Sequence, residues 1–201
     1  MYSKQSKKRM GVWLLLAFLF ILTIASCHSE VATPRPDGYF RIEAYPKTYT
    51  AQQLGSITLL INDSAQCLWH HPESARDAQW LNIGYPRYNA TIYLSYIPLQ
   101  NNLKRLMGES LELVYRQNIN TEQVEAVAYE NPGIPLYATL FALSPESATP
   151  FQFIATDSTK YLLRGALYFD APVKADSVAP ALQHIEGDIM QLIESITPIA
   201  P

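Results

Sequence analysis

Hydrophobic residues are arranged in two ways along this chain, as one apolar segment near the start and as short periodic stretches afterwards. Residues 11–25 are almost entirely apolar, and residues 1–10 carry four basic side chains and no acidic one. A basic segment followed by an apolar one is typical of a signal peptide. The apolar segment has about fifteen residues, fewer than the roughly twenty that cross a bilayer as a helix.

The apolar segment ends in Ile24-Ala25-Ser26-Cys27. An ordinary secretory signal ends in an Ala-x-Ala-like site, whereas small residues directly before a cysteine are similar to a bacterial lipobox, whose cysteine is acylated. We therefore expect residues 1–26 to be a cleaved lipoprotein signal peptide and Cys27 to be the lipid attachment site. Two or three acyl chains would anchor the protein stably, since one chain holds only weakly. An uncleaved inner-membrane anchor, or a plain signal peptide with a chance cysteine, is the alternative.

Alternation of apolar and polar residues predicts strands in the rest of the chain. Residues 27–37 lack any period and contain two prolines, so we expect an extended, lipidated tether there. Strands are predicted over residues 38–45, 56–61, 80–85, 90–97, 124–129, 135–143, 151–156 and 161–169. A tight turn at 157–160 would join the last two strands into a hairpin. Residues 66–76 show neither period and are predicted to form a loop.

Two stretches have the helical period instead. The first runs from Asn101 to Val114 with apolar residues on one side and charged residues on the other, and the second runs from Asp176 to Ile196 with Pro180 in its first turn. Hairpin strands with two such helices predict an α+β fold, in which an antiparallel or mixed β-sheet has two amphipathic helices packed on one face. The length favours a single globular domain over residues 38–201.

Charge and cysteine content restrict the possible functions. Four of the 15 basic residues and none of the 18 acidic ones lie before Cys27, so the mature chain has 11 basic and 18 acidic residues and a net charge of −7. This balance argues against a nucleic-acid partner. The chain contains two cysteines, and a lipid on Cys27 would leave Cys67 without a disulfide partner in the chain.

The sequence contains no convincing catalytic constellation. Cys67, His70 and His71 resemble a set of metal ligands, but a fourth ligand and a second pair at the usual spacing are missing. We therefore predict no catalytic residue, no metal site and no cofactor. An anchored domain without catalysis must act through contacts, for which aromatic and arginine side chains are favoured. The candidate contact residues are Tyr39, Arg41, Trp80, Tyr96 and Arg164.

Several blocks of the chain resemble the gliding motility lipoprotein GldD family of Bacteroidota. These blocks are Pro34–Ile42, Trp80–Ile83 with Tyr85-Pro86, Ala90–Tyr96, Asn101–Leu103, Thr156–Ser158, Leu163–Phe169 and Asp176–Pro180. They follow the order found in the family and cover essentially the whole mature domain. Asp37 departs from the basic residue expected before the Gly-Tyr-Phe-Arg block, so we infer no basic patch at the tether.

The resemblance implies a non-enzymatic envelope protein required for gliding motility. It also implies an assembly or stabilising role in the type IX secretion and gliding apparatus, beside other lipoproteins of that machinery. Neither an aspartate nor an acidic run follows Cys27 directly, so we expect the periplasmic face of the outer membrane rather than the inner membrane or the cell surface. The alternatives are an envelope hydrolase or metal-binding enzyme using Cys67, His70 and His71, and a carrier of a small hydrophobic ligand.

Overall fold

The computed structural model describes most of the unit Arg41–Pro201. The described residues are 43–70, 74, 77–116, 124–144, 147–170 and 175–199. The predicted signal peptide, the lipidation site Cys27 and the tether lie outside the described residues, as do Tyr39 and Arg41.

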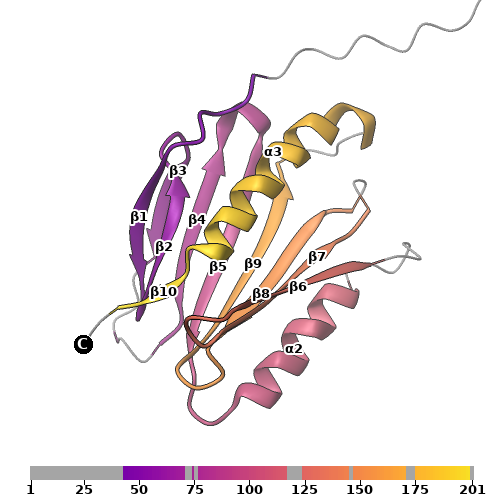
Figure 1. The fold of residues 1–201 in the computed structure, drawn as a ribbon. Helices are drawn as coiled ribbons and strands as arrows, with labels where there is room; N and C mark the ends of the chain where they lie inside the picture. Colours follow the sequence, from indigo (N-terminus) through magenta and orange to yellow (C-terminus); the bar gives the residue numbers. More distant parts are fainter. Residues whose placement is uncertain are drawn as a thin grey trace, which may run out of the picture. The chain divides into compact units, whose positions relative to one another are not determined.

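A seven-stranded antiparallel sheet forms the main layer of this unit (Figure 1). In spatial order its strands are β3 (Gln66–His70), β4 (Gln79–Tyr85), β5 (Ala90–Pro98), β9 (Tyr161–Phe169), β8 (Phe151–Thr156), β7 (Leu136–Ala142) and β6 (Glu125–Asn131). Strands β5 and β9 pair along their full length, from Ala90 opposite Phe169 to Pro98 opposite Tyr161. The register of this central pairing determines which side chains of β5 and β9 share a face of the sheet.

A smaller antiparallel sheet consists of β1 (Tyr49–Leu54), β2 (Ile57–Asn62) and β10 (Thr197–Pro198). Strands β1 and β2 form a hairpin whose turn includes Gly55 at φ 58°. A short 3-10 helix, η1 (Pro86–Tyr88), connects β4 to β5.

Helices α2 (Leu103–Arg116) and α3 (Ala175–Glu194) cover opposite faces of the seven-stranded sheet. Successive side chains of a strand point to opposite faces. Leu163 and Leu167 of β9 pack in the large core that contains α3 and the β1–β2 hairpin, whereas Leu162 packs in the smaller core under α2. The expectation that both helices lie on one face is therefore corrected. The helical period of each segment predicts which side of the helix is buried. It does not predict against which face of the sheet the helix packs.

The predicted α+β class is confirmed, and most predicted elements appear within a few residues of their expected bounds. Three local predictions are corrected. Residues 43–48 are not part of a strand, and Gln66–His70 forms β3 where a loop was expected. Pro180 lies in the second turn of α3 because this helix begins at Ala175. The strands β1 and β10 were not predicted.

Among the described residues, neither helix combines the length and the apolar character that a membrane-spanning segment needs.

Candidate functional site

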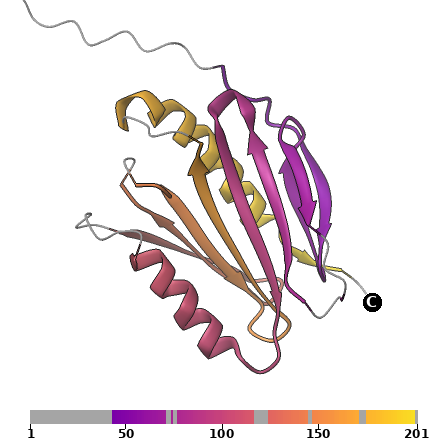
Figure 2. The same cartoon turned by 180° about the vertical axis from the view of Figure 1, so that it is seen from behind.

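Helix α2 covers only part of its face of the seven-stranded sheet. Its buried residues Leu106 and Val114 pack on Phe141, Ile154 and Leu162, which belong to β7, β8 and β9. In Figure 2, which views the domain from behind, α2 leaves β4 and most of β5 uncovered. We call the uncovered area on β3, β4, β5 and β9 the open face. Its outward side chains are Leu68, His70, Trp80, Asn82, Tyr93, Ser95, Arg164, Ala166 and Tyr168.

The open face carries large apolar side chains in contact with solvent. Leu68 is 58 % exposed, Trp80 is 46 % exposed and Tyr93 is 42 % exposed. The strand register places Leu68 opposite Asn82, and Asn82 opposite Tyr93, so these side chains share one cross-strand row. Exposed apolar groups gathered on one surface, rather than scattered singly, mark sites of interaction.

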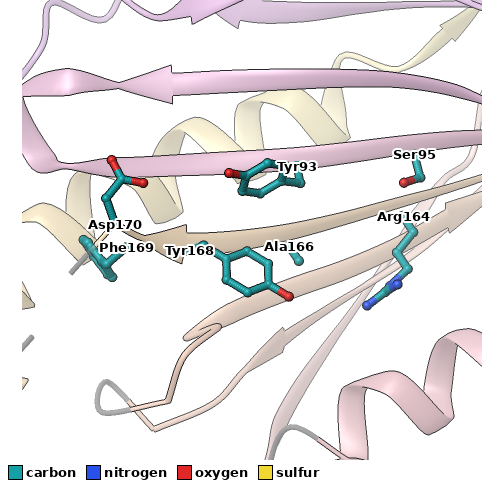
Figure 3. Close-up of a pocket in the computed structure, with 7 residues that line it drawn as sticks. All are labelled: Tyr93, Ser95, Arg164, Ala166, Tyr168, Phe169 and Asp170. Atoms are coloured by element: carbon teal, nitrogen blue, oxygen red, sulfur yellow. The ribbon is translucent and has the colours of Figure 1, made fainter. Parts of the chain in front are cut away.

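A pocket of about 460 Å³ lies at the β5–β9 side of the open face. Figure 3 shows its lining residues, which are Tyr93, Ser95, Arg164, Ala166, Tyr168, Phe169 and Asp170. The small side chains of Ser95 and Ala166 leave the space between the larger residues. The rings of Tyr93 and Tyr168 meet edge to face with centroids 5.5 Å apart, and Arg164 and Asp170 lie at opposite ends of the view.

Arg164 is the basic residue that lines this pocket, and its hydrogen bond within the domain is long. Its Nη2 donates to Oε1 of the buried Gln152 at 3.4 Å, and its buried Nε–H has no hydrogen-bond partner within the described part of the chain. The ion pairs found among the described residues are Arg105–Glu109 and Arg116–Glu112, both on the surface of α2. Burial lowers the pKa of Arg164 from its ordinary value, because a low-dielectric environment disfavours the charged form.

The structure brings together two of the five predicted contact residues. Trp80 and Arg164 share one cross-strand row through Ser95. Tyr96 is instead 4 % exposed and points into the core on the other face, where its hydroxyl lies 2.8 Å from Ser56 Oγ. It therefore packs inside the domain. Tyr39 and Arg41 lie outside the described residues.

Sequence reasoning missed Leu68 and Tyr168 as members of this surface. Leu68 was assigned to a loop because Gln66–His70 is too short to show a clear period. Tyr168 could have been found, since it lies four residues after Arg164 in a predicted strand and must therefore share its face.

The strand geometry does not bring Cys67 and His70 together. Cys67 lies opposite Ile83 and packs against the large core, and its half-buried thiol has a pKa raised by burial. His70 points to the open face, where its Nε2 lies 3.5 Å from Nδ2 of Asn82. His71, the third residue of the predicted ligand set, lies outside the described residues.

A second polar cluster lies inside the fold around Asp188 of α3. Its Oδ1 accepts a hydrogen bond of 2.7 Å from the Tyr49 hydroxyl, and its Oδ2 accepts one of 3.2 Å from Nδ2 of Asn62. Asp188 is 9 % exposed. Because Tyr49 and Asn62 belong to β1 and β2, this cluster attaches the helix to the hairpin and is structural.

A comparison with protein-family models shows what the chain is similar to. Residues 29–197 match the model described as "Gliding motility lipoprotein GldD". This range includes both helices and every strand except the last residue of β10. Comparison with curated proteins gives no match.

Proposed function

Because the chain belongs to the GldD family of gliding motility lipoproteins, we propose that it acts as a non-enzymatic assembly or stabilising factor of the gliding apparatus and the type IX secretion machinery. The family places it in the cell envelope as a lipid-anchored protein. In our proposal the lipid is on Cys27 and the domain faces the periplasm from the outer membrane. The open face is its docking surface for another component of the machinery.

The exposed apolar side chains gathered on the open face are the observation that supports this proposal. Burying Leu68, Trp80 and Tyr93 on a partner would remove apolar surface from water, which is the main driving force of association. Tryptophan and tyrosine are also the residues that contribute most to binding at the centre of interfaces. The open face therefore has the composition of an interface rather than of an ordinary sheet surface.

The two alternative functions have less support. Cys67 and His70 point to opposite faces of β3, so they do not form a common metal or catalytic site. A crevice of about 260 Å³ does lie between α2 and the sheet, with Met107, Leu111 and Phe141 among its lining residues. This volume is below the roughly 300–1,000 Å³ of most small-molecule sites, which argues against a ligand carried between α2 and the sheet.

Deletion and co-purification in the native host test the proposed function. The deletion strain should lose spreading or type IX cargo secretion. The Leu68→Ser/Trp80→Ala variant should reach normal envelope levels but recover fewer gliding or type IX components in mild detergent. Tyr115→Ala is the matched control, because Tyr115 is 59 % exposed on α2, away from the open face. Normal spreading and secretion in a clean deletion would contradict the proposal.

A further inference from the structure

We propose that the pocket on the open face binds the carboxylate of an aspartate or glutamate side chain of the partner protein, with Arg164 as the residue that recognises it. This inference rests on the proposed function, since it names the chemistry of the partner at the same surface. It makes Arg164 the specificity determinant of an interface whose remaining contacts are apolar.

Arg164 forms no ion pair with the described residues of the domain. A charge that is partly removed from water is costly unless it is paired. Arg164 is half-buried, yet its described hydrogen bond is one of 3.4 Å to a neutral amide, and its buried Nε–H is unpaired within the described residues. The described residues thus give this guanidinium no carboxylate partner. A carboxylate from outside would supply the missing charge.

The guanidinium of Arg164 lies near the apolar side chains of the open face. Arg164 is in one cross-strand row with Ser95 and Trp80, and Figure 3 shows its side chain extending away from Ser95, with the guanidinium on the side of Tyr168. A partner whose apolar side chains cover Trp80 would exclude water from this row. Charge-assisted hydrogen bonds become stronger in such surroundings, and guanidinium and carboxylate can pair through two parallel bonds.

Few charged residues line the pocket. Arg164 is the single basic residue among those that line the pocket, and Asp170 lies at the other end. A polyanionic surface would meet one cation, an opposing carboxylate and a mature chain of net charge −7. One guanidinium matches one carboxylate instead. These charges favour an acidic protein side chain over the phosphates of a lipid surface.

The binding test uses small probes and does not depend on gliding. The mature chain, residues 27–201 with Cys27→Ala, is titrated with acetyl-Ala-Glu-Ala-amide, acetyl-Ala-Gln-Ala-amide or inorganic phosphate, and the Nε–H resonances of its arginines are followed by NMR. Arg87 is the internal control, because it is exposed and its Nη1 already donates to the carbonyls of Glu43 and Ala44. We expect a saturable shift at Arg164 alone, with the Gln peptide binding at least about tenfold more weakly.

The variant Arg164→Met keeps most of the apolar stem and removes the charge. It should keep the urea unfolding midpoint of the wild type, lose the difference between the Glu and Gln peptides, and recover less partner from envelopes, whereas Arg164→Lys should retain part of the recovery. Equal binding of both peptides, equal shifts at Arg87 and Arg164, no saturable shift, or tighter binding of phosphate would each overturn the inference. Normal spreading and secretion in the deletion strain would instead remove the proposed function and leave the peptide result standing.

Discussion

At the scale of single residues, Gly55 occupies a position with no room for a side chain. Its φ of +58° is unfavourable for other residues, and a Cβ built there would come within 2.2 Å of the Tyr96 ring. We expect Gly55→Ala to lower the free energy of unfolding by about 2 kcal/mol or more, from backbone strain and overpacking together.

Urea unfolding checks this expectation, with Gly108→Ala as the control. Gly108 lies in α2 with no neighbouring atom within 4 Å of a built Cβ. Alanine there should raise stability by about 1 kcal/mol through its higher helix propensity. Equal effects of the two substitutions would show that the hairpin turn tolerates a side chain at position 55.

The buried tyrosines make the domain sensitive to alkaline pH. Burial raises the pKa of Tyr85 well above its ordinary value of 10.0, with further contributions from Asp188, and burial also raises the pKa of Tyr161. As pH rises, the two hydroxyls in the folded state therefore stay protonated to a higher pH than they do in the unfolded chain. The contribution of these protonated hydroxyls to the free energy of unfolding is complete below about pH 10 and is lost as pH rises further.

Thermal melting at pH 8 and pH 11 measures this effect. The wild type should lose stability between the two values, and Tyr85→Phe should lose less because it has one buried ionisable group fewer. Tyr115→Phe is the control, since Tyr115 is exposed. A drop in melting temperature of the same size in all three proteins would contradict the assignment to the buried hydroxyls.

At the scale of elements, the attachment of α3 depends on the Asp188 cluster. Asp188→Ala leaves the Tyr49 hydroxyl and the Asn62 amide without their carboxylate acceptor. We expect a loss of about 2–3 kcal/mol, because an unsatisfied buried polar group costs its full desolvation penalty.

Hydrogen exchange should locate that loss in β1, β2 and α3, while the amides of β8 and β9 remain protected. Glu186→Ala is the matched control, since Glu186 lies on the exposed side of the same helix. If both variants opened the same amides to the same extent, the cluster would have no specific part in holding the hairpin to the helix.

At the scale of the whole molecule, we predict that the membrane association depends on Cys27. Cys27→Ala should move the protein from the membrane fraction to the periplasmic fraction, because each buried methylene of the acyl chains contributes about 0.8 kcal/mol to membrane binding. Cys67→Ala is the control, since Cys67 packs within the domain and should not affect fractionation. Retention of Cys27→Ala in membranes washed with high salt would contradict lipid anchoring.

The sequence by itself determined the elements whose signal is local and the family to which the chain belongs. Helix α2 and strand β5 were predictable because one face of each is apolar with the proper period. The strands β1, β3 and β10 carry no such signal, because β1 has one buried residue, β3 has none, and the two residues of β10 are both exposed. Residue type alone was enough to select Trp80 and Arg164 as contact candidates. It could not show that Tyr96, selected in the same way, is buried.

Only the tertiary structure decided which face each helix covers and which side chains remain outside. Strand alternation divides the side chains between the two faces of the sheet. It does not determine which face is buried, because that depends on the elements that pack on each face. Once α3 and the β1–β2 hairpin cover one side, Tyr96 becomes buried. Because the buried residues of α2 pack on β7, β8 and β9 on the other side, Leu68, Trp80 and Tyr93 stay in contact with solvent, and Arg164 lines the pocket beside them without a carboxylate from the described part of the domain.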